Sequence, residues 1–273
     1  FVRTIPDQGG YLIFNGLNQL INQINNYKFE ESDLEYLRSL NLFDEDFLEY
    51  LKEMKLKLDI WSIEEGTPVF ANEPLVTVRG PLIQTQLVET LLLLCINYPT
   101  LVTTKARRIV ESAKKRSIME FGVRRAQGID ASVEGARAAY IAGCVGTSNT
   151  LAGLKYNIPT SGTMAHSFVQ MHENEYQAFL EYVKIQPNNS VLLVDTYDTL
   201  NSGVPNAIKV AYDYLIPNGY RLKGIRLDSG DLAYLSKKAR LLLDQNGLYD
   251  CKIIASNALD EDIIDDLLVQ DAR

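Results

Sequence analysis

The chain has 273 residues, of which 46% are hydrophobic and 23% are charged, and its formal net charge is -8. This length and composition can bury a sizeable core in one large or two medium domains. The acidic balance argues against a dedicated nucleic-acid binder, because such proteins hold phosphates chiefly with Lys and Arg. An anionic small-molecule substrate stays compatible, provided that basic side chains gather around it.

The cysteines and apolar runs predict a soluble protein of a reducing compartment. Cys95, Cys144 and Cys251 are odd in number, far apart and set in apolar stretches. We therefore predict three reduced core residues, with neither a disulfide framework nor a zinc site, and a cytoplasmic location. We expect no membrane segment, because the nearest apolar run, at residues 91–96, is short, and no signal peptide.

The first 115 residues predict an α/β domain. Residues 11–26 have apolar side chains at helical spacing, and residues 31–54 predict two short acidic helices separated at Asn41. Short strands follow at residues 56–61, 69–70 and 75–81, with Gly and Pro as breaks. Two helices, at residues 82–96 and 100–114, then lead out of this domain.

From residue 116 a short apolar strand and a helix alternate roughly every 30 residues, the scale of a βα unit. We predict strands at residues 117–121, 144–147, 158–160, 191–195, 224–227 and 252–255. We predict helices at residues 131–142, 173–185, 204–215, 232–244 and 260–269. The apolar strands suit a parallel sheet covered on both faces.

Polar residues recur just past the ends of these strands. They are Arg124, Thr147, Ser148, Asp195, Asp198, Arg226, Asp228, Ser256 and Asn257. In a βα barrel this rim holds the active site, so the recurrence predicts an enzyme.

His166 is the better candidate for chemistry of the two histidines. It lies in the loop at residues 162–167, where small residues let a ligand approach the backbone and a helix N-terminus can hold an anion. A hydrogen-bonded loop histidine without a catalytic role is the competing interpretation. For His172, beside Glu173 and Glu175, we expect a solvated or core-edge position.

Two pairs of polar residues end predicted strands. Asp195 and Asp198 follow a buried strand, where an unpaired carboxylate is costly, so one of them should have a partner, although Asp198 equally suits a helix cap. Arg226 and Asp228 are two residues apart and point the same way, so they can bind an anion and stabilise a cation. A salt bridge, with Asp231 as an N-cap, is the simpler alternative.

Phe121, followed by Arg124 and Arg125, suits stacking of a flat ring and binding of a phosphate, although a lone Phe at a strand end is usually core. The sequence has no Gly-x-Gly-x-x-Gly, no Walker loop and no Asp-Asp ribose-phosphate loop. Its His and Cys spacing matches no metal site. We therefore predict no protein metal site.

Six segments together resemble nicotinate phosphoribosyltransferase in order and spacing: residues 120–126, 146–149, 162–167, 195–198, 226–231 and 255–257. The resemblance implies a type II phosphoribosyltransferase fold of class α/β. Residues 1–115 would form an N-terminal α/β open-sandwich domain with linking helices. Residues 116–273 would form an irregular TIM-like (β/α) barrel, incomplete here.

The resemblance also implies an activity. The family joins nicotinate to phosphoribosyl pyrophosphate, giving nicotinate mononucleotide and pyrophosphate in the first step of NAD salvage from nicotinate. ATP, with Mg²⁺, is hydrolysed through a phosphohistidine, which by resemblance is His166, so the enzyme is classed as an ATP-coupled ligase. The family works as a homodimer with shared active sites.

Residue roles follow from the same resemblance. Asp228 would stabilise the oxocarbenium character of the ribose, and Asp195 would orient the neutral imidazole of His166. Phe121 would stack on the pyridine ring. Arg226 would face the nicotinate carboxylate or the nucleotide phosphate, and Arg124 a phosphate.

The remaining predicted substrate contacts are Thr147, Ser148 and Ser167. Related nicotinamide-using enzymes have an acidic residue at the place of Ser148, which accepts hydrogen bonds from an amide and repels a carboxylate. The serine therefore favours nicotinate. We also expect Arg124, His166 and Arg226 to converge on one pocket.

Two alternatives stay open: nicotinamide or quinolinate phosphoribosyl transfer on the same fold, and a catalytically inactive truncated fragment. The sequence begins at Phe1 without Met and ends inside a helical pattern at Arg273. The family begins earlier, with a segment whose Tyr stacks on nicotinate across the dimer. It also continues with further strands and a glycine-rich phosphate-binding loop.

Overall fold

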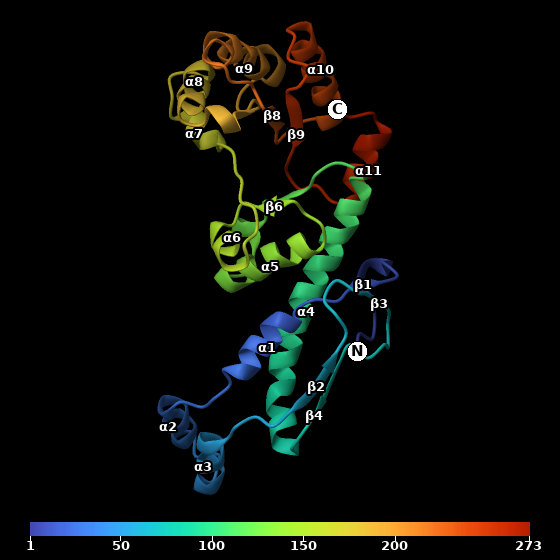
Figure 1. Cartoon of the computed structure of the whole chain (residues 1–273), viewed down its shortest axis with the longest axis vertical. Coiled ribbons are helices and arrows are strands. Elements are labelled where there is room, and N and C mark those ends of the chain that lie inside the picture. Colours follow the sequence, from blue (N-terminus) through green and yellow to red (C-terminus); the bar gives the residue numbers. More distant parts are fainter. The chain divides into compact units, whose positions relative to one another are not determined.

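The computed structural model describes all residues from Phe1 to Arg273. By its internal contacts the chain divides into two compact units (Figure 1). The first unit contains residues 1–110 and 117–160, and the second contains residues 111–116 and 161–273. The predicted domain division at residues 115 and 116 stays a prediction.

The N-terminal part of the first unit has two small antiparallel pairs of strands and three short helices. Its elements are β1 (Leu12–Ile13), α1 (Leu17–Asn25), α2 (Glu31–Ser39), α3 (Glu45–Glu53), β2 (Asp59–Ser62), β3 (Pro68–Val69) and β4 (Val76–Arg79). Strand β1 pairs with β3, and β2 pairs with β4. The helix predicted from residue 11 begins only at Leu17, because the two residues of β1 are extended against β3.

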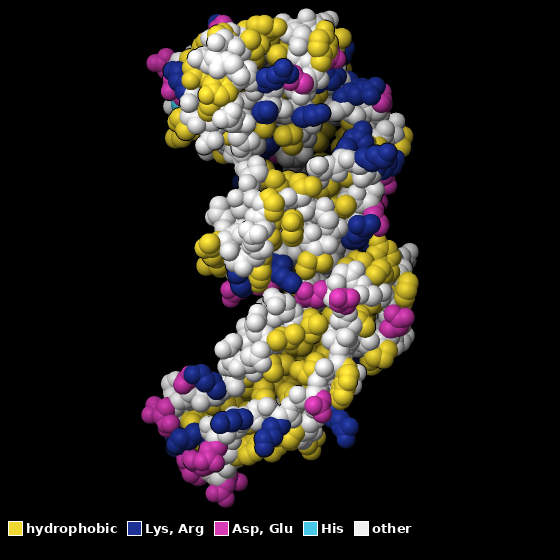
Figure 2. Space-filling model, in the orientation of Figure 1, with side chains coloured by type: hydrophobic (Ala, Val, Ile, Leu, Met, Phe, Trp, Pro, Cys, Tyr) yellow, Lys and Arg dark blue, Asp and Glu magenta, His cyan; other side chains and the backbone are white.

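The two acidic helices α2 and α3 are confirmed. Asn41 separates them in the left-handed conformation, at φ 53°, which Asn tolerates better than most residues. Leu34, Leu48 and Leu51 form the small buried core between them. Their outer surfaces carry charged side chains of both signs, which Figure 2 shows gathered over these helices.

A single long helix, α4 (Leu82–Ser112), replaces the two helices predicted here. Pro99 lies inside it and cannot donate the usual backbone hydrogen bond to the carbonyl of Cys95. Gly16 lies against that same carbonyl: a Cβ on Gly16 would lie 2.0 Å from the Cys95 oxygen. The prediction of a break was wrong because the helix continues through Pro99.

Helix α4 is bound to the start of the unit by buried threonines. Thr104 Oγ1 accepts a hydrogen bond from Ile13 N at 2.8 Å, and Thr100 Oγ1 accepts one from Asn15 N at 3.1 Å.

By length and composition alone, α4 is also apolar enough to cross a membrane. This finding corrects the expectation that no segment of the chain is long and apolar enough to do so. The core helix of a soluble protein can have the same length and composition.

The rest of the first unit begins the parallel βα pattern. It contains β5 (Met119–Glu120), α5 (Ile129–Ile141), β6 (Gly146–Thr147) and α6 (Thr150–Tyr156). Strands β5 and β6 are parallel, with Glu120 opposite Thr147. The strand predicted at residues 158–160 is only a parallel bridge between Thr147 and Thr160.

The second unit contains a three-stranded parallel sheet in the order β7-β8-β9. Its elements are α7 (His166–Gln170), α8 (Glu175–Ile185), β7 (Val191–Leu193), α9 (Val204–Val210), β8 (Gly224–Leu227), α10 (Leu232–Gln245), β9 (Lys252–Ala255) and α11 (Glu261–Val269). Short π-helical turns at residues 199–203 and 211–215 flank α9. Fully buried Phe179, Leu192, Ile225 and Leu243 lie in the core of this unit.

All three cysteines are free and buried, which confirms the prediction of reduced core residues. Burial raises the pKa of Cys144 to about 11 and that of Cys251 to about 12. Because the thiolate is the reactive form, neither thiol is suited to nucleophilic chemistry.

Candidate functional site

His166 is the centre of a polar cluster in the second unit. Its Nδ1 lies 3.0 Å from Thr196 Oγ1, and its Nε2 lies 3.5 Å from Asp228 Oδ2. Asp195 Oδ1 lies 3.9 Å from the same Nε2. The imidazole is 36% exposed, so a ligand from solvent can reach it. One ring nitrogen therefore faces a hydroxyl, and the other faces two carboxylates.

Asp195 lies just beyond β7, and its side chain is only 1% exposed. Its Oδ2 accepts hydrogen bonds from Asp228 N at 2.7 Å and from Ser229 Oγ at 2.6 Å. Its Oδ1 is buried without a hydrogen-bond partner. An unsatisfied buried carboxylate oxygen is costly, and His166 Nε2, at 3.9 Å, faces this oxygen.

Arg226 and Asp228 form the ion pair that their spacing allows, with Arg226 Nη2 at 3.2 Å from Asp228 Oδ1. The guanidinium is 14% exposed. It also donates to Ser256 Oγ through Nε at 3.0 Å and to Thr163 Oγ1 through Nη1. Arg226 thus binds the loop before His166 to the ends of β8 and β9.

The surroundings of Asp228 keep it ionised. Burial raises the pKa of this carboxyl, but the hydrogen bond from Ser256 and the charge of Arg226 outweigh burial, and the net pKa is lowered. Ser256 Oγ donates to Asp228 Oδ1 at 2.5 Å. Since Oδ1 is held by Ser256 and Arg226, Oδ2 is the oxygen turned toward His166.

Asp198 and Asp231 cap helical segments, which is the simpler alternative that the sequence offered for each. Asp198 Oδ1 accepts from Leu200 N at 3.1 Å and Asn201 N at 2.9 Å, and so caps the π-helical turn. Asp231 Oδ1 accepts from Tyr234 N at 2.9 Å and caps α10. These contacts explain both carboxylates without any catalytic role.

His172 occupies the core edge, as expected. Its Nδ1 lies 2.8 Å from the Phe168 carbonyl oxygen, and its ring lies 4.7 Å from that of Phe168, centroid to centroid. A carbonyl can only accept, so Nδ1 carries the proton. Ser167, next to His166, is exposed.

The other predicted substrate residues lie in the first unit. Phe121 is 40% exposed, so its ring is not part of the core. Arg124 is exposed and has no ion-pair partner. Thr147 is fully buried, and Ser148 beside it is half-buried. The expected convergence of Arg124 with His166 and Arg226 joins residues of both units and stays a prediction.

Several side-chain partners of the predicted site residues were not predicted from the sequence. Thr196, Thr163 and Glu120 each bind a predicted site residue through the side chain. Each lies within or next to a segment that carries the resemblance, which is the only sequence signal for them. No group of three or more His, Cys, Asp or Glu side chains could hold a metal ion.

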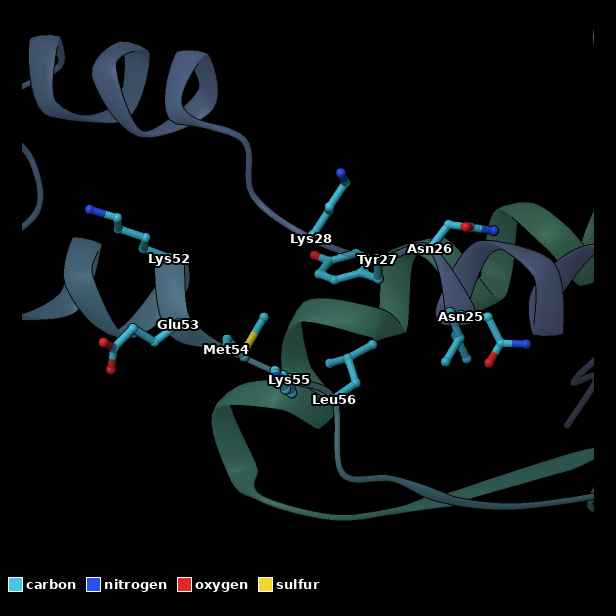
Figure 3. Close-up of a pocket in the computed structure, with 10 residues that line it drawn as sticks. Asn25, Asn26, Tyr27, Lys28, Lys52, Glu53, Met54, Lys55 and Leu56 are labelled. Carbon is cyan, nitrogen blue, oxygen red and sulfur yellow. The ribbon is translucent and has the colours of Figure 1, made fainter.

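A cavity of about 620 Å³ at the ends of α1 and α3 contains none of the candidate residues. Lys28 and Lys52 line it, and Figure 3 shows their side chains extending in different directions. Each is already paired with a carboxylate, Lys28 with Glu30 at 2.5 Å and Lys52 with Glu49 at 3.8 Å. The cavity therefore shows no convergent binding groups.

Two family models match the chain. Residues 1–97 match the nicotinate phosphoribosyltransferase N-terminal domain, and residues 116–270 match the nicotinate phosphoribosyltransferase family. The chain belongs to the nicotinate phosphoribosyltransferase family. This confirms the resemblance inferred from the six segments.

Relatives of known name agree with this assignment. The chain is 50% identical to a nicotinate phosphoribosyltransferase of Bacillus subtilis, over 100% of this chain and 55% of that protein. It is 44% identical to nicotinate phosphoribosyltransferase pncB2 of Mycobacterium tuberculosis, over 98% of this chain and 57% of that protein. The chain thus spans about half the length of the curated relatives it matches.

Solved structures confirm the fold class. The crystal structure of human nicotinic acid phosphoribosyltransferase matches with a TM-score of 0.91 at 29% identity, covering 98% of this chain and 65% of that chain. A nicotinate-nucleotide pyrophosphorylase from Pyrococcus furiosus shares the fold, with a TM-score of 0.77 at 22% identity over 97% of this chain and 60% of that one. The open parallel sheets of this family member fit an incomplete barrel.

Proposed function

We propose that the protein carrying this chain is an ATP-coupled nicotinate phosphoribosyltransferase. It would form nicotinate mononucleotide and pyrophosphate from nicotinate and phosphoribosyl pyrophosphate, in NAD salvage. The observation that carries the proposal is His166, exposed to ligands on one side and held between Thr196 and two carboxylates on the other. The family membership and the relatives' names support the same activity.

His166 is the proposed phosphoryl acceptor. Asp228 and Asp195 both face Nε2, so they favour the tautomer with its proton there. Nδ1 then keeps its lone pair and accepts from the Thr196 hydroxyl until ATP binds. In the transfer, a bond forms between Nδ1 and the γ-phosphorus, and the bond from that phosphorus to the oxygen of ADP breaks. The carboxylates stabilise the ring as its charge increases.

Phosphoribosyl transfer is the second proposed step. The bond between ribose C1 and the pyrophosphate oxygen breaks, and the nicotinate ring nitrogen forms the new bond to C1. The ionised Asp228 stabilises the positive charge that develops on the ribose. Arg226 orients Asp228 and keeps it ionised. In this proposal Phe121 stacks on the pyridine ring, Arg124 binds a phosphate, and Thr147 and Ser167 complete the substrate contacts.

Ser148 carries the proposed preference for nicotinate. It is half-buried, and its hydroxyl can donate to a carboxylate without adding negative charge. An acidic side chain at this position would repel the substrate carboxylate. The competing proposals are the use of nicotinamide or quinolinate on the same fold.

The remaining proposals come from the family. Mg²⁺ would bind together with ATP and phosphoribosyl pyrophosphate, because proteins usually hold this cation through the phosphate oxygens of the substrate and only one or two carboxylates. A cytoplasmic homodimer with shared active sites would complete the enzyme. The exposed leucines of α4, such as Leu93, Leu94 and Leu101, offer apolar surface to a partner.

Steady-state rates with the three pyridine substrates test the proposal. The protein is incubated with phosphoribosyl pyrophosphate, ATP and Mg²⁺ and with each of nicotinate, nicotinamide and quinolinate. We expect kcat/KM for nicotinate to exceed the other two by about 100-fold or more, since one buried charge contrast is worth several kcal/mol. A preference for nicotinamide would overturn the role of Ser148, and no mononucleotide with any substrate would favour a catalytically inactive chain.

A further inference from the structure

Glu120, the last residue of β5, binds two separate segments of the first unit. Its Oε2 accepts a hydrogen bond from Thr147 Oγ1 at 2.5 Å, and its Oε1 accepts one from Gly122 N. Its backbone oxygen accepts a third from Ser148 N at 2.9 Å. One residue thus holds the turn that follows Phe121 and also the end of β6.

The hydrogen bond with Thr147 has a fixed direction. Thr147 is fully buried, and its Oγ1 already accepts from Asn149 N at 2.9 Å. Its hydroxyl hydrogen therefore points to Glu120, the acceptor within reach. A carboxylate is a stronger acceptor for this hydrogen than a neutral group.

Gly122 leaves room for the Glu120 carboxylate beside the turn. A Cβ on Gly122 would lie 2.8 Å from Glu120 Oε1 and push the carboxylate away. The turn continues as a single 3-10 turn at Val123–Arg125, with Arg125 N donating to Gly122 O at 2.9 Å. Arg124 lies within this turn.

The backbone on both sides of Phe121 is held in place. Phe121 itself is 40% exposed and lies outside the core. Glu120 holds the chain on both sides of it, through β5 before it and through Gly122 after it. Loss of the Glu120 carboxylate would release the turn from Thr147 and leave the backbone hydrogen bond from Ser148 N to Glu120 O as the remaining link.

We propose that Glu120 is a positioning residue, which couples the turn at residues 121–125 to Thr147 and Ser148. The ring-stacking side and the carboxylate-binding side of the nicotinate site then keep a fixed geometry relative to one another. This inference rests on the proposed function for its substrate, but the coupling itself is a property of the protein alone.

Hydrogen exchange tests the coupling without substrate. Amide exchange is measured by mass spectrometry over residues 121–126 and 147–149 in the wild type, Glu120→Ala and Glu120→Gln. Exposed Glu89 on α4 gives the control Glu89→Ala. We expect Glu120→Ala to speed exchange in both segments together, on the order of tenfold, because each lost hydrogen bond to a charged group loosens its own segment. Glu120→Gln offers one acceptor oxygen to the two donors, Gly122 N and Thr147 Oγ1, so its exchange should lie between that of the wild type and that of Glu120→Ala.

Thr147 gives a second pair of variants, which decides the question even if Glu120→Ala unfolds. Thr147→Val removes the hydroxyl and keeps the shape, whereas Thr147→Ser keeps the hydroxyl. We expect Thr147→Val, and not Thr147→Ser, to speed exchange in residues 121–126, which are in another segment. Unchanged exchange there in Thr147→Val would overturn the coupling.

Kinetics connect the coupling to substrate. For Glu120→Ala we expect the KM for nicotinate to rise about tenfold, while the KM for phosphoribosyl pyrophosphate changes less than about threefold. Glu120→Gln, which keeps one of the two acceptor oxygens, should restore the KM for nicotinate in part. Equal rises in both KM values would overturn the assignment to the nicotinate site. A wild type that uses no nicotinate would overturn the proposed function, and hydrogen exchange would still decide whether Glu120 couples the segments.

Discussion

Asp195 Oδ1 lies 3.9 Å from His166 Nε2 and has no hydrogen-bond partner, although the Asp195 side chain is only 1% exposed. The second oxygen of the same carboxylate is held by Asp228 N and Ser229 Oγ. The carboxylate is therefore fixed in place with one oxygen aimed at the imidazole. A buried acceptor of this kind is stabilised when a donor, either on a ligand or on His166 Nε2, makes a hydrogen bond to it.

Asp195→Asn should impair phosphorylation of His166. The amide oxygen can still accept from Asp228 N and Ser229, which leaves the NH₂ group facing His166 Nε2. That donor favours the tautomer with its proton on Nδ1, where we place the nucleophile. We expect phosphorylation to slow on the order of 100-fold or more, measured with labelled ATP. Asp198→Asn, an exposed cap, is the control, and equal rates for the two variants would contradict the role of Asp195.

Ser256→Ala should weaken the protein more at neutral pH than in acid. Asp228 has a lowered pKa because the Ser256 hydrogen bond and the Arg226 charge outweigh burial. A lowered folded-state pKa gives stability that is present above the unfolded pKa and lost as pH falls through the folded value. We expect a loss of about 1–2 kcal/mol at pH 7. Urea unfolding at pH 7 and pH 3 measures it, and a difference that does not shrink in acid would contradict the account.

Glu175→Gln should stabilise the protein at neutral pH relative to acid. Glu175 is 2% exposed, and burial, assisted by Asp198 and Asp195, raises its pKa although Ser202 donates to it. A raised carboxyl pKa means that the wild type loses stability as pH rises from the unfolded value, about 4.3, through the folded one. Gln has no such loss. Urea unfolding across this pH window should show the free energy of unfolding of the variant increasing relative to that of the wild type. If the difference between the two proteins stays constant with pH, the raised pKa is refuted.

Gly16→Ala should destabilise the first unit strongly. Gly16 has φ 106°, and an added Cβ would lie 2.0 Å from the carbonyl oxygen of Cys95. Gly10→Ala is the matched control, because Gly10 has φ 75° and open space around it. We expect about 1 kcal/mol for Gly10→Ala, from the backbone alone. For Gly16→Ala we expect at least about 3 kcal/mol, from the added clash. Equal losses of thermal stability would show that α4 tolerates the methyl group.

The sequence predicts the parallel sheet of the second unit well. The bounds of β8 and β9 are those expected, and α10 differs by one residue, because apolar runs flanked by Asp and Gly leave few alternatives. The continuous α4 was missed because Pro99 is a strong local helix breaker. Its loss of one hydrogen bond is tolerated in a helix that threonines bind to residues 13 and 15.

The site is predicted less completely than the strands. Positions just past strand ends predicted Asp195, Arg226 and Asp228, and the small-residue loop at residues 162–167 predicted His166. The structure brings these four residues together in one cluster. Thr196 and Glu120 were not predicted as partners because their roles depend on side-chain contacts between segments. The Glu120 contacts join residues up to 28 positions apart, as with Ser148 N, and no local pattern encodes such pairing.

Phosphorylation of His166 is the central claim, and its position on the ring is the most direct test. The protein is incubated with ATP labelled at the γ-phosphate, and the product is examined by NMR in the wild type, His166→Ala and His172→Ala. We predict an acid-labile phosphoryl group on Nδ1 of His166 that is absent in His166→Ala and kept in His172→Ala. A phosphoryl group on Nε2 would contradict the assigned tautomer, and labelling that survives His166→Ala would contradict the mechanism itself.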